Sequence, residues 1–199
     1  RCKKNYYIWQ VRMVKKINAC IFISGRGTNL KSIIMSSRDY NFPISVKLII
    51  SDNDNAKGLK YAKKYNIPYK FFNYKNKIQF EKKCLLEVKK RNIKLLCLAG
   101  FMKMLSKNFI MNFKHKIVNI HPSLLPRFKG LNTHKRVLKN KEKFTGCTVH
   151  YVNSKLDSGR VIMQKKIKIN LNDNEHSLEK RVLKQENSLY PEAIRSIFR

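Results

Sequence analysis

Short runs of apolar residues recur along the chain and predict β-strands. A run of four to eight apolar residues, bounded by turn-forming residues, is typical of a strand that is buried on both faces. In one run apolar and polar residues alternate, so that Thr148 and His150 face away from Cys147 and Val149. The predicted strands span residues 17–23, 46–50, 95–99, 116–120, 145–152 and 161–169.

Apolar side chains at helical spacing occupy most of the intervals between these strands. Ser106 and Thr133 are expected to cap two of the resulting helices, because their hydroxyl groups can accept from free backbone N–H groups. Pro191 is expected either to begin a new helical segment or to kink the last helix. The predicted helices cover residues 29–37, the region around 62, 78–91, 107–111, the region around 137 and the chain from about 175.

This alternation of strand and helix favours an α/β fold. The expected architecture is a Rossmann-like open, mostly parallel sheet with helices on both faces. A chain of 199 residues suits one domain, which we place at residues 13–199, and we expect residues 1–12 to be a disordered extension. No apolar run in the sequence is long enough to cross a bilayer, so no membrane partner is expected.

The charge of the chain is unusual and raises the question of a nucleic-acid partner. Forty-four Lys and Arg residues against twelve Asp and Glu residues give a formal net charge of +32. Such a charge attracts polyanions. The basic residues are nevertheless spread along the whole sequence and form no block interleaved with aromatic residues. We therefore interpret the excess as compositional bias and not as a nucleic-acid-binding surface.

The cysteines predict a reducing compartment. Their number is odd, no C-x-x-C pair is present, and Cys20, Cys97 and Cys147 lie in apolar strand-like segments. These residues are expected to be small buried thiols, without a disulfide frame or a metal site. A cytoplasmic location is the expectation that follows.

Three motifs with possible chemistry follow predicted strands. The first, Ser24-Gly25-Arg26-Gly27-Thr28-Asn29, precedes a helix. Glycines allow close approach of a ligand to the backbone, and the free N–H groups of a helix start favour an anion. The motif is neither a complete G-x-G-x-x-G nor a P-loop, so it fits a phosphate cradle and a simple tight turn equally well.

The second motif places an amide beside an imidazole. Asn119 and His121 lie two residues apart in a predicted strand and therefore point to the same side, and Pro122 ends the strand. This pair suits a reaction that develops an oxyanion, although it also fits a polar strand end with a hydrogen-bonded core histidine. The third motif is the loop 153–159 with Asp157, which by itself is typical of a turn.

Taken together, the motifs make residues 13–198 resemble the glycinamide ribonucleotide formyltransferases of purine synthesis. The resemblance implies an enzyme that transfers the formyl group of 10-formyltetrahydrofolate, a co-substrate, to the amine of 5'-phosphoribosylglycinamide. It implies a tetrahedral oxyanion intermediate, small-molecule partners and no metal. The resembling segments are 23–30, 98–102, 119–126 with Gly130, 146–152, 156–159, and Gln185-Glu186 with Tyr190-Pro191.

The resemblance also implies roles for individual residues. Asn119 would donate to the oxyanion, His121 would stabilise it and supply a proton, and Asp157 would orient the imidazole. The substrate phosphate and ribose would be held by Gly27, Thr28, Asn29 and Glu186. The folate pocket would comprise Lys77, Met102, Lys103, Met104, Leu105, Asn119, Asn153, Ser154, Lys155, Leu156 and Asp157. Lys77 and Asn132 depart from the family, which often has Arg and His at these positions.

Three alternatives remain open. A methionyl-tRNA formyltransferase would suit the positive charge, but that family carries an additional C-terminal domain for which we expect no residues here. A formyltetrahydrofolate hydrolase normally has an N-terminal regulatory domain, and at most sixteen residues precede the first predicted strand. A nucleic-acid-binding protein on the same scaffold would not need Asn119, His121 and Asp157 together. The sequence allows a monomer or a homodimer.

Overall fold

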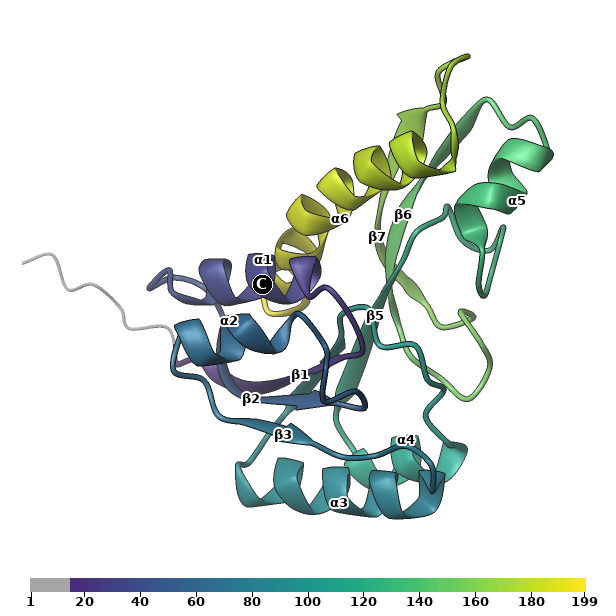
Figure 1. The fold of residues 1–199 in the computed structure, drawn as a ribbon. Coiled ribbons are helices and arrows are strands. Elements are labelled where there is room, and N and C mark those ends of the chain that lie inside the picture. Colours follow the sequence, from purple (N-terminus) through teal and green to yellow (C-terminus); the bar gives the residue numbers. More distant parts are fainter. Residues whose placement is uncertain (1–14) are drawn as a thin grey trace, which may run out of the picture.

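The computed structural model describes residues 15–199, and Figure 1 shows the path of the chain. The expected extension over residues 1–12 lies outside the described residues, as do the first two residues of the expected domain. Two layers of helices enclose one sheet, so the predicted α/β class is confirmed. Among the described residues, no helix is both long and apolar enough to span a membrane.

The sheet has seven strands in the order β3-β2-β1-β4-β5-β6-β7. Strands β1 to β5 pair in parallel, whereas β6 runs antiparallel to β5 and β7 runs antiparallel to β6. The sheet is therefore mostly parallel, as expected, with an antiparallel hairpin at one edge. The strands are β1 (Ile17–Ile23), β2 (Ile44–Ser51), β3 (Tyr69–Phe71), β4 (Leu95–Leu98), β5 (Lys116–His121), β6 (Phe144–Tyr151) and β7 (Val161–Lys168).

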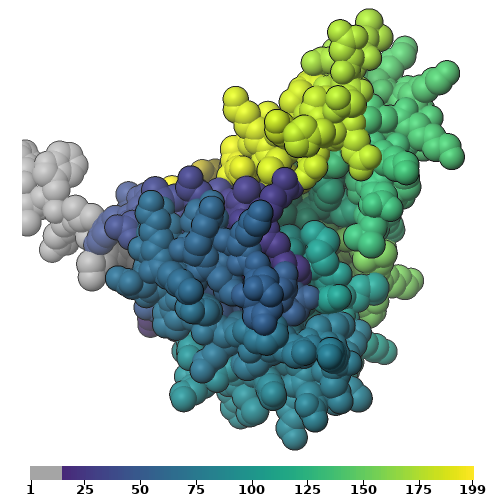
Figure 2. Space-filling model, viewed as in Figure 1, coloured from purple at the N-terminus to yellow at the C-terminus, as the bar shows by residue number. Residues whose placement is uncertain are grey.

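Helices cover both faces of the sheet. Buried side chains of α1, α2, α5 and α6 share one hydrophobic cluster, and those of α3 and α4 share the other. The amino-terminal part of α6, helix α5 and the adjoining ends of β6 and β7 form a projection in Figures 1 and 2. The helices are α1 (Thr28–Ser37), α2 (Leu59–Lys64), α3 (Lys77–Lys90), α4 (Lys107–Phe113), α5 (Thr133–Lys139) and α6 (Glu175–Ile197).

The cysteines that the sequence placed in buried apolar segments are buried in the structure. Cys20, Cys97 and Cys147 are fully buried free thiols, and burial raises the pKa of each. Tyr190 ties α6 to the centre of the sheet, because its buried hydroxyl group lies 3.0 Å from the carbonyl oxygens of both Leu98 and Val118. A buried phenol requires such partners, and here they fix the helix over β4 and β5.

The structure differs from the predicted elements at three points: β3 was missed, the Thr133 cap is wrong, and one of the two alternatives for Pro191 is wrong. Strand β3 was not predicted, because its three residues are exposed and form the edge of the sheet. Thr133 is not a cap: Asn132 occupies that position, and the hydroxyl group of Thr133 donates to the carbonyl oxygen of Gly130. Pro191 does not begin a new segment. It lies inside α6, where buried neighbours such as Ile194 offset the roughly 3 kcal/mol cost of an interior proline.

Candidate active site

A cavity of about 550 Å³ opens beyond the ends of β4 and β5. Asn119 and His121 of β5 line the cavity together with the segment after β4, the start of α5, the start of α6 and the loop after β6. Ligands of parallel α/β sheets bind at this edge, as the sequence predicted. The lining includes Gly100, Phe101, Met102, Lys103, Met104, Leu105, Asn119, His121, His134, His150, Asn153, Lys155, Leu156, Asp157, Glu175 and Glu179.

Asn119 is held in place by His150. The two residues are cross-strand partners on β5 and β6, and the Asn119 Nδ2 atom lies 3.3 Å from the His150 Nε2 atom. His150 Nδ1 lies 2.8 Å from the carbonyl oxygen of Tyr151, which can only accept, so Nδ1 carries the proton and Nε2 accepts from Asn119. Burial lowers the pKa of His150 and so keeps the ring neutral, although Tyr151 and Asp157 oppose that shift. One N–H of Asn119 is thereby fixed and the other is free for a ligand.

His121 lies between two acceptors. Its Nε2 atom is 2.8 Å from the carbonyl oxygen of Phe128, and its Nδ1 atom is 3.4 Å from Asp157 Oδ2. Both side chains of the His121–Asp157 pair are only 7% exposed. Because both ring nitrogens face acceptors, only the doubly protonated imidazolium satisfies both contacts. Both ring nitrogens of His121 are thus held against acceptors.

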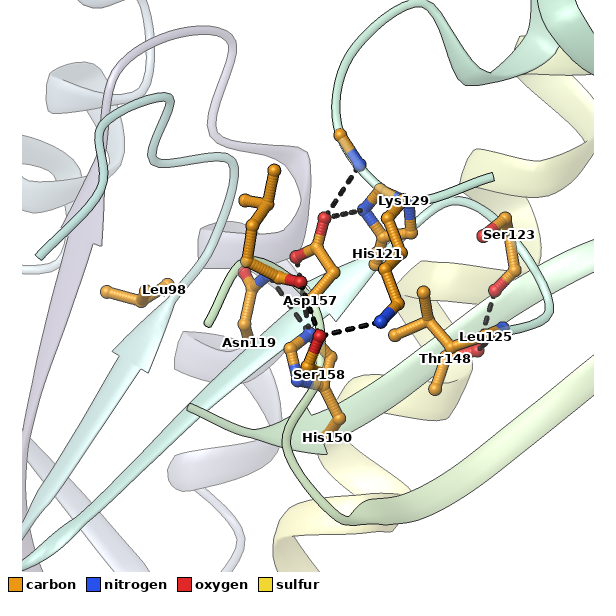
Figure 3. A network of polar contacts seen from close by, with 12 residues as sticks. Leu98, Asn119, His121, Ser123, Leu125, Lys129, Thr148, His150, Asp157 and Ser158 are labelled. Atoms are coloured by element: carbon orange, nitrogen blue, oxygen red, sulfur yellow. Dashed lines mark hydrogen bonds and ion pairs between the residues drawn. The ribbon is translucent and has the colours of Figure 1, made fainter. Parts of the chain in front are cut away.

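Asp157 reaches this position although its loop begins elsewhere. Strand β6 is antiparallel, and its last residue, Tyr151, pairs with Val118, three residues (roughly 10 Å) from His121. The loop must therefore fold back along the sheet to reach His121. The direction of β6 alone does not predict this return. The backbone N–H of Gly130 donates to Asp157 Oδ2 over 2.9 Å and holds the carboxylate there. Figure 3 shows Asp157 between His121 and His150.

The predicted phosphate turn is built by the main chain. Gly27, with φ +72°, occupies the N-cap of α1, and a Cβ atom there would lie 2.5 Å from the Cα of Gly58. Asn29 Nδ2 donates to Glu186 Oε2 over 2.7 Å, and both residues are buried. Burial raises the pKa of Glu186, and the Asn29 contact partly opposes the shift. The residues proposed for phosphate and ribose are therefore one connected group, in which Thr28 is the first residue of α1.

The two halves of the predicted site are linked by Ser24. Its Oγ atom accepts from the backbone N–H of Met102 over 2.9 Å, which joins the turn after β1 to the segment after β4. The hydroxyl group of Tyr74 donates to the carbonyl oxygen of Met104, and Lys103 lies over the ring of Tyr74. The wall expected to face the folate is thus fixed from two sides.

Two of the residues expected at the folate pocket lie elsewhere. Lys77 begins α3 and lines a second cavity, of about 1010 Å³, beside α3 and α4. Ser154 is exposed in the loop after β6 and is not part of the cavity lining, unlike its neighbours Asn153 and Lys155. The other predicted folate residues, Met102 to Leu105, Asn119, Leu156 and Asp157 among them, all line the first cavity.

Sequence reasoning missed four titratable residues of the cavity. His150 could have been found from the sequence, since the alternation in 145–152 places it on the same face as Thr148. His134 follows Gly130 closely in the sequence, and burial lowers its pKa, against the opposing effect of Glu179 and Glu175. These two carboxylates lie one helical turn apart at the start of α6, and Glu179 forms an ion pair with Arg26. Within residues 15–199, no cluster of three or more potential metal ligands is present.

Comparison with known proteins identifies the family. The sequence profile described as formyl transferase matches residues 17–194. Phosphoribosylglycinamide formyltransferase of Haemophilus influenzae is 37% identical over 185 residues, which cover 92% of this chain and 86% of that protein. The human trifunctional purine biosynthetic protein adenosine-3 is 37% identical over 186 residues, which cover 92% of this chain but only 18% of that protein.

Solved structures agree with the sequence comparison. The crystal structure of phosphoribosylglycinamide formyltransferase from Brucella melitensis superposes with a TM-score of 0.87 at 36% identity, covering 92% of this chain and 96% of that one. Glycinamide ribonucleotide transformylase 1 from Geobacillus kaustophilus gives a TM-score of 0.88 at 34% identity, with 92% and 100% covered. The resemblance seen in the motifs is confirmed, and the chain belongs to the formyl transferase family.

Proposed function

We propose that this chain transfers the formyl group of 10-formyltetrahydrofolate to the amine of 5'-phosphoribosylglycinamide, a step of purine (IMP) synthesis. The observation that carries the proposal is the convergence of Asn119, His121 and Asp157 in one cavity. The names of the bacterial relatives, which this chain matches over nearly their whole length, support the same reaction. A cytoplasmic location suits a reaction between small metabolites.

The cavity, together with the turn 24–29 that Ser24 joins to it, suits the two substrates. Apolar side chains such as Met102 and Leu105 beside a few polar groups suit a flat heterocycle like that of a folate. The start of α1 offers backbone N–H groups to a phosphate. Glu186 would accept from the ribose hydroxyl groups. Lys103 and Lys155 line the cavity and suit the carboxylates of the folate tail.

The proposed mechanism gives each member of the trio a role. The amine nitrogen attacks the formyl carbon, a C–N bond forms, and the carbonyl oxygen becomes an oxyanion. The free N–H of Asn119 donates to this oxygen, and charged His121 stabilises it electrostatically. The bond to folate N10 then breaks, and N10 takes a proton from His121 Nε2, which leaves the Phe128 carbonyl oxygen to donate it. The proton lost by the amine restores the imidazolium. Asp157 holds the ring and stabilises its charge throughout.

The direct test is formyl transfer from 10-formyltetrahydrofolate to phosphoribosylglycinamide, followed by folate absorbance. We expect turnover with this amine and far less with water. Charged initiator tRNA and water are the acceptors to compare. The first is the substrate expected of a methionyl-tRNA formyltransferase, and the second is that of a formyltetrahydrofolate hydrolase. Preferential turnover of tRNA or of water would overturn the proposal, and no turnover with any acceptor would favour a binding protein on the same scaffold.

A further inference from the structure

A short backbone segment, residues 127–130, orients two members of the proposed trio. The carbonyl oxygen of Phe128 accepts from His121 Nε2 over 2.8 Å. Two residues later, the N–H of Gly130 donates to Asp157 Oδ2 over 2.9 Å. The mutual geometry of His121 and Asp157 therefore depends on where this segment lies. A displacement near 1 Å at a reacting centre can cost about 10²-fold in rate.

The segment is held by side-chain donors rather than by a helix or strand. Arg136, from α5, donates through Nη2 to the carbonyl oxygens of both Phe128 and Lys129, at 3.0 and 2.6 Å. Ser123 Oγ donates to the carbonyl oxygen of Arg127 over 2.6 Å, so three successive carbonyls each accept from a side chain. The guanidinium carbon of Arg136 also lies 5.9 Å from the ring centroid of Phe128.

The conformation of Phe128 explains why such restraint is needed. Its φ of +55° lies in the left-handed region, which costs a residue with a Cβ on the order of 1–3 kcal/mol and persists only when the surroundings enforce it. Within the described chain, Arg136 pairs with no carboxylate, so its donors at Nη2 are directed at these carbonyls. The same Phe128 oxygen thus receives Arg136 on one side and His121 on the other.

We propose that Arg136 is a positioning residue for formyl transfer. By holding the carbonyls of Phe128 and Lys129 it fixes the ring of His121 through the Phe128 oxygen and the carboxylate of Asp157 through the N–H of Gly130. Arginine suits this role because its planar group can serve two neighbouring oxygens, whereas the lysine ammonium is a single compact donor. The inference rests on the proposed function for its kinetic consequence, but its structural consequence can be measured without substrate.

The kinetic test compares Arg136→Met with Arg136→Lys. Methionine keeps an aliphatic side chain and removes every donor, so we expect kcat to fall about 10-fold while the KM of either substrate changes by less than about 3-fold. Lysine should restore part of the lost kcat. The matched control is Lys135→Met, an exposed neighbour on the same helix, which removes one positive charge and should leave kcat unchanged.

The second readout is the imidazole nitrogen NMR spectrum of the ligand-free protein, with His121 assigned from a His121→Gln sample. We expect the Nε2 signal of His121 to shift in Arg136→Met and to stay in place in Lys135→Met. An unchanged His121 signal in a folded Arg136→Met protein would overturn the inference, as would a raised KM with normal kcat. If the unmodified protein lacked transferase activity, the proposed function would fail while the NMR comparison still decided the role of Arg136.

Discussion

The two ends of the proposed site are constructed differently. At one end, the turn 24–29 is shaped by main-chain contacts: Gly27 packs on Gly58, and the N–H of Gly58 donates to the carbonyl oxygen of Gly25 over 2.9 Å. At the other end, the loop 153–159 is held mainly by side chains. Asp157 contacts His121 and Gly130 there, and Lys129 Nζ donates to Ser158 Oγ over 2.6 Å.

This difference matches the chemistry proposed for each end. A phosphate carries its charge before and after the reaction, so rigid backbone N–H groups suffice to bind it. The reacting end must hold charge that appears only in the transition state, which requires oriented side chains. We therefore expect the turn to be sensitive to an added methyl group, and the loop to be sensitive to a change of charge at constant shape.

Asp157→Asn should give the largest effect. Asparagine has nearly the same shape, tolerates the left-handed conformation of this position (φ +43°), and can still accept from Gly130. It removes the negative charge facing His121, so we expect kcat to fall about 10³-fold with little change in KM. Steady-state kinetics and a thermal melt check this prediction. If kcat fell only slightly, or if its fall were accompanied by a large drop in melting temperature, the Asp157 contacts would serve the structure of the loop alone.

Asn119→Leu should give the next largest effect. The substitution keeps the volume of the side chain but removes the N–H proposed for the oxyanion, so we expect about a 10²-fold loss of kcat. His150→Gln is the matched comparison, because glutamine can still accept from Asn119 and should lose much less activity. Comparable losses in the two variants would mean that the amide acts through His150 and not on the substrate.

The parallel part of the fold could be predicted because its strands are buried on both faces. Continuous apolar runs such as 17–23 and 95–99 leave few alternatives once helices of the right spacing follow them. Strand β3 could not be predicted, since an exposed edge strand of three residues has no such pattern. The direction of β6 could not be predicted either. The pattern of apolar residues is the same for a parallel and an antiparallel strand, and only the pairing with a neighbouring strand distinguishes them.

The site was predictable where it depends on local geometry. Asn119 and His121 share a side because successive strand residues alternate, and the structure places both in the cavity. The contact of Phe128 with His121, and that of Arg136 with the carbonyl oxygen of Phe128, were not predictable, because they depend on the path of a loop. Asp157 was selected only by resemblance, since its own loop begins level with Val118 and must fold back.

Gly27→Ala tests the main-chain end. The new Cβ would meet the Cα of Gly58 at 2.5 Å in a residue with φ +72°, so we expect the free energy of unfolding to fall by about 2 kcal/mol and the KM for the phosphorylated amine to rise. Gly25→Ala is the control, because a Cβ there meets nothing within 4 Å, and its effect should stay below about 0.5 kcal/mol. Urea denaturation measures both. If the two substitutions had equal effects, the close packing of Gly27 on Gly58 would not be what shapes the turn 24–29.

Glu186→Gln should give the smallest effect, on the order of 1 kcal/mol in stability. Because burial raises the folded-state pKa of Glu186, its contribution to stability is complete below the unfolded value near 4.5 and is lost as pH rises through the folded value. Glutamine cannot ionise, and its carbonyl can still accept from Asn29, so the variant should be more stable than the unmodified protein at pH 8 but not at pH 4. Thermal melts across this range measure the difference.

The same variant should bind the phosphorylated amine less tightly, because an amide oxygen is a weaker acceptor than a carboxylate for ribose hydroxyl groups. Higher stability together with a higher KM would mean that the buried carboxylate is retained for the substrate at the expense of the fold. The phosphate end would then differ from the loop in more than its main-chain construction, since the buried charge of Glu186, which Asn29 contacts from α1, would destabilise the free protein. Lower stability of Glu186→Gln at pH 8 would instead assign Glu186 to holding α1 against α6.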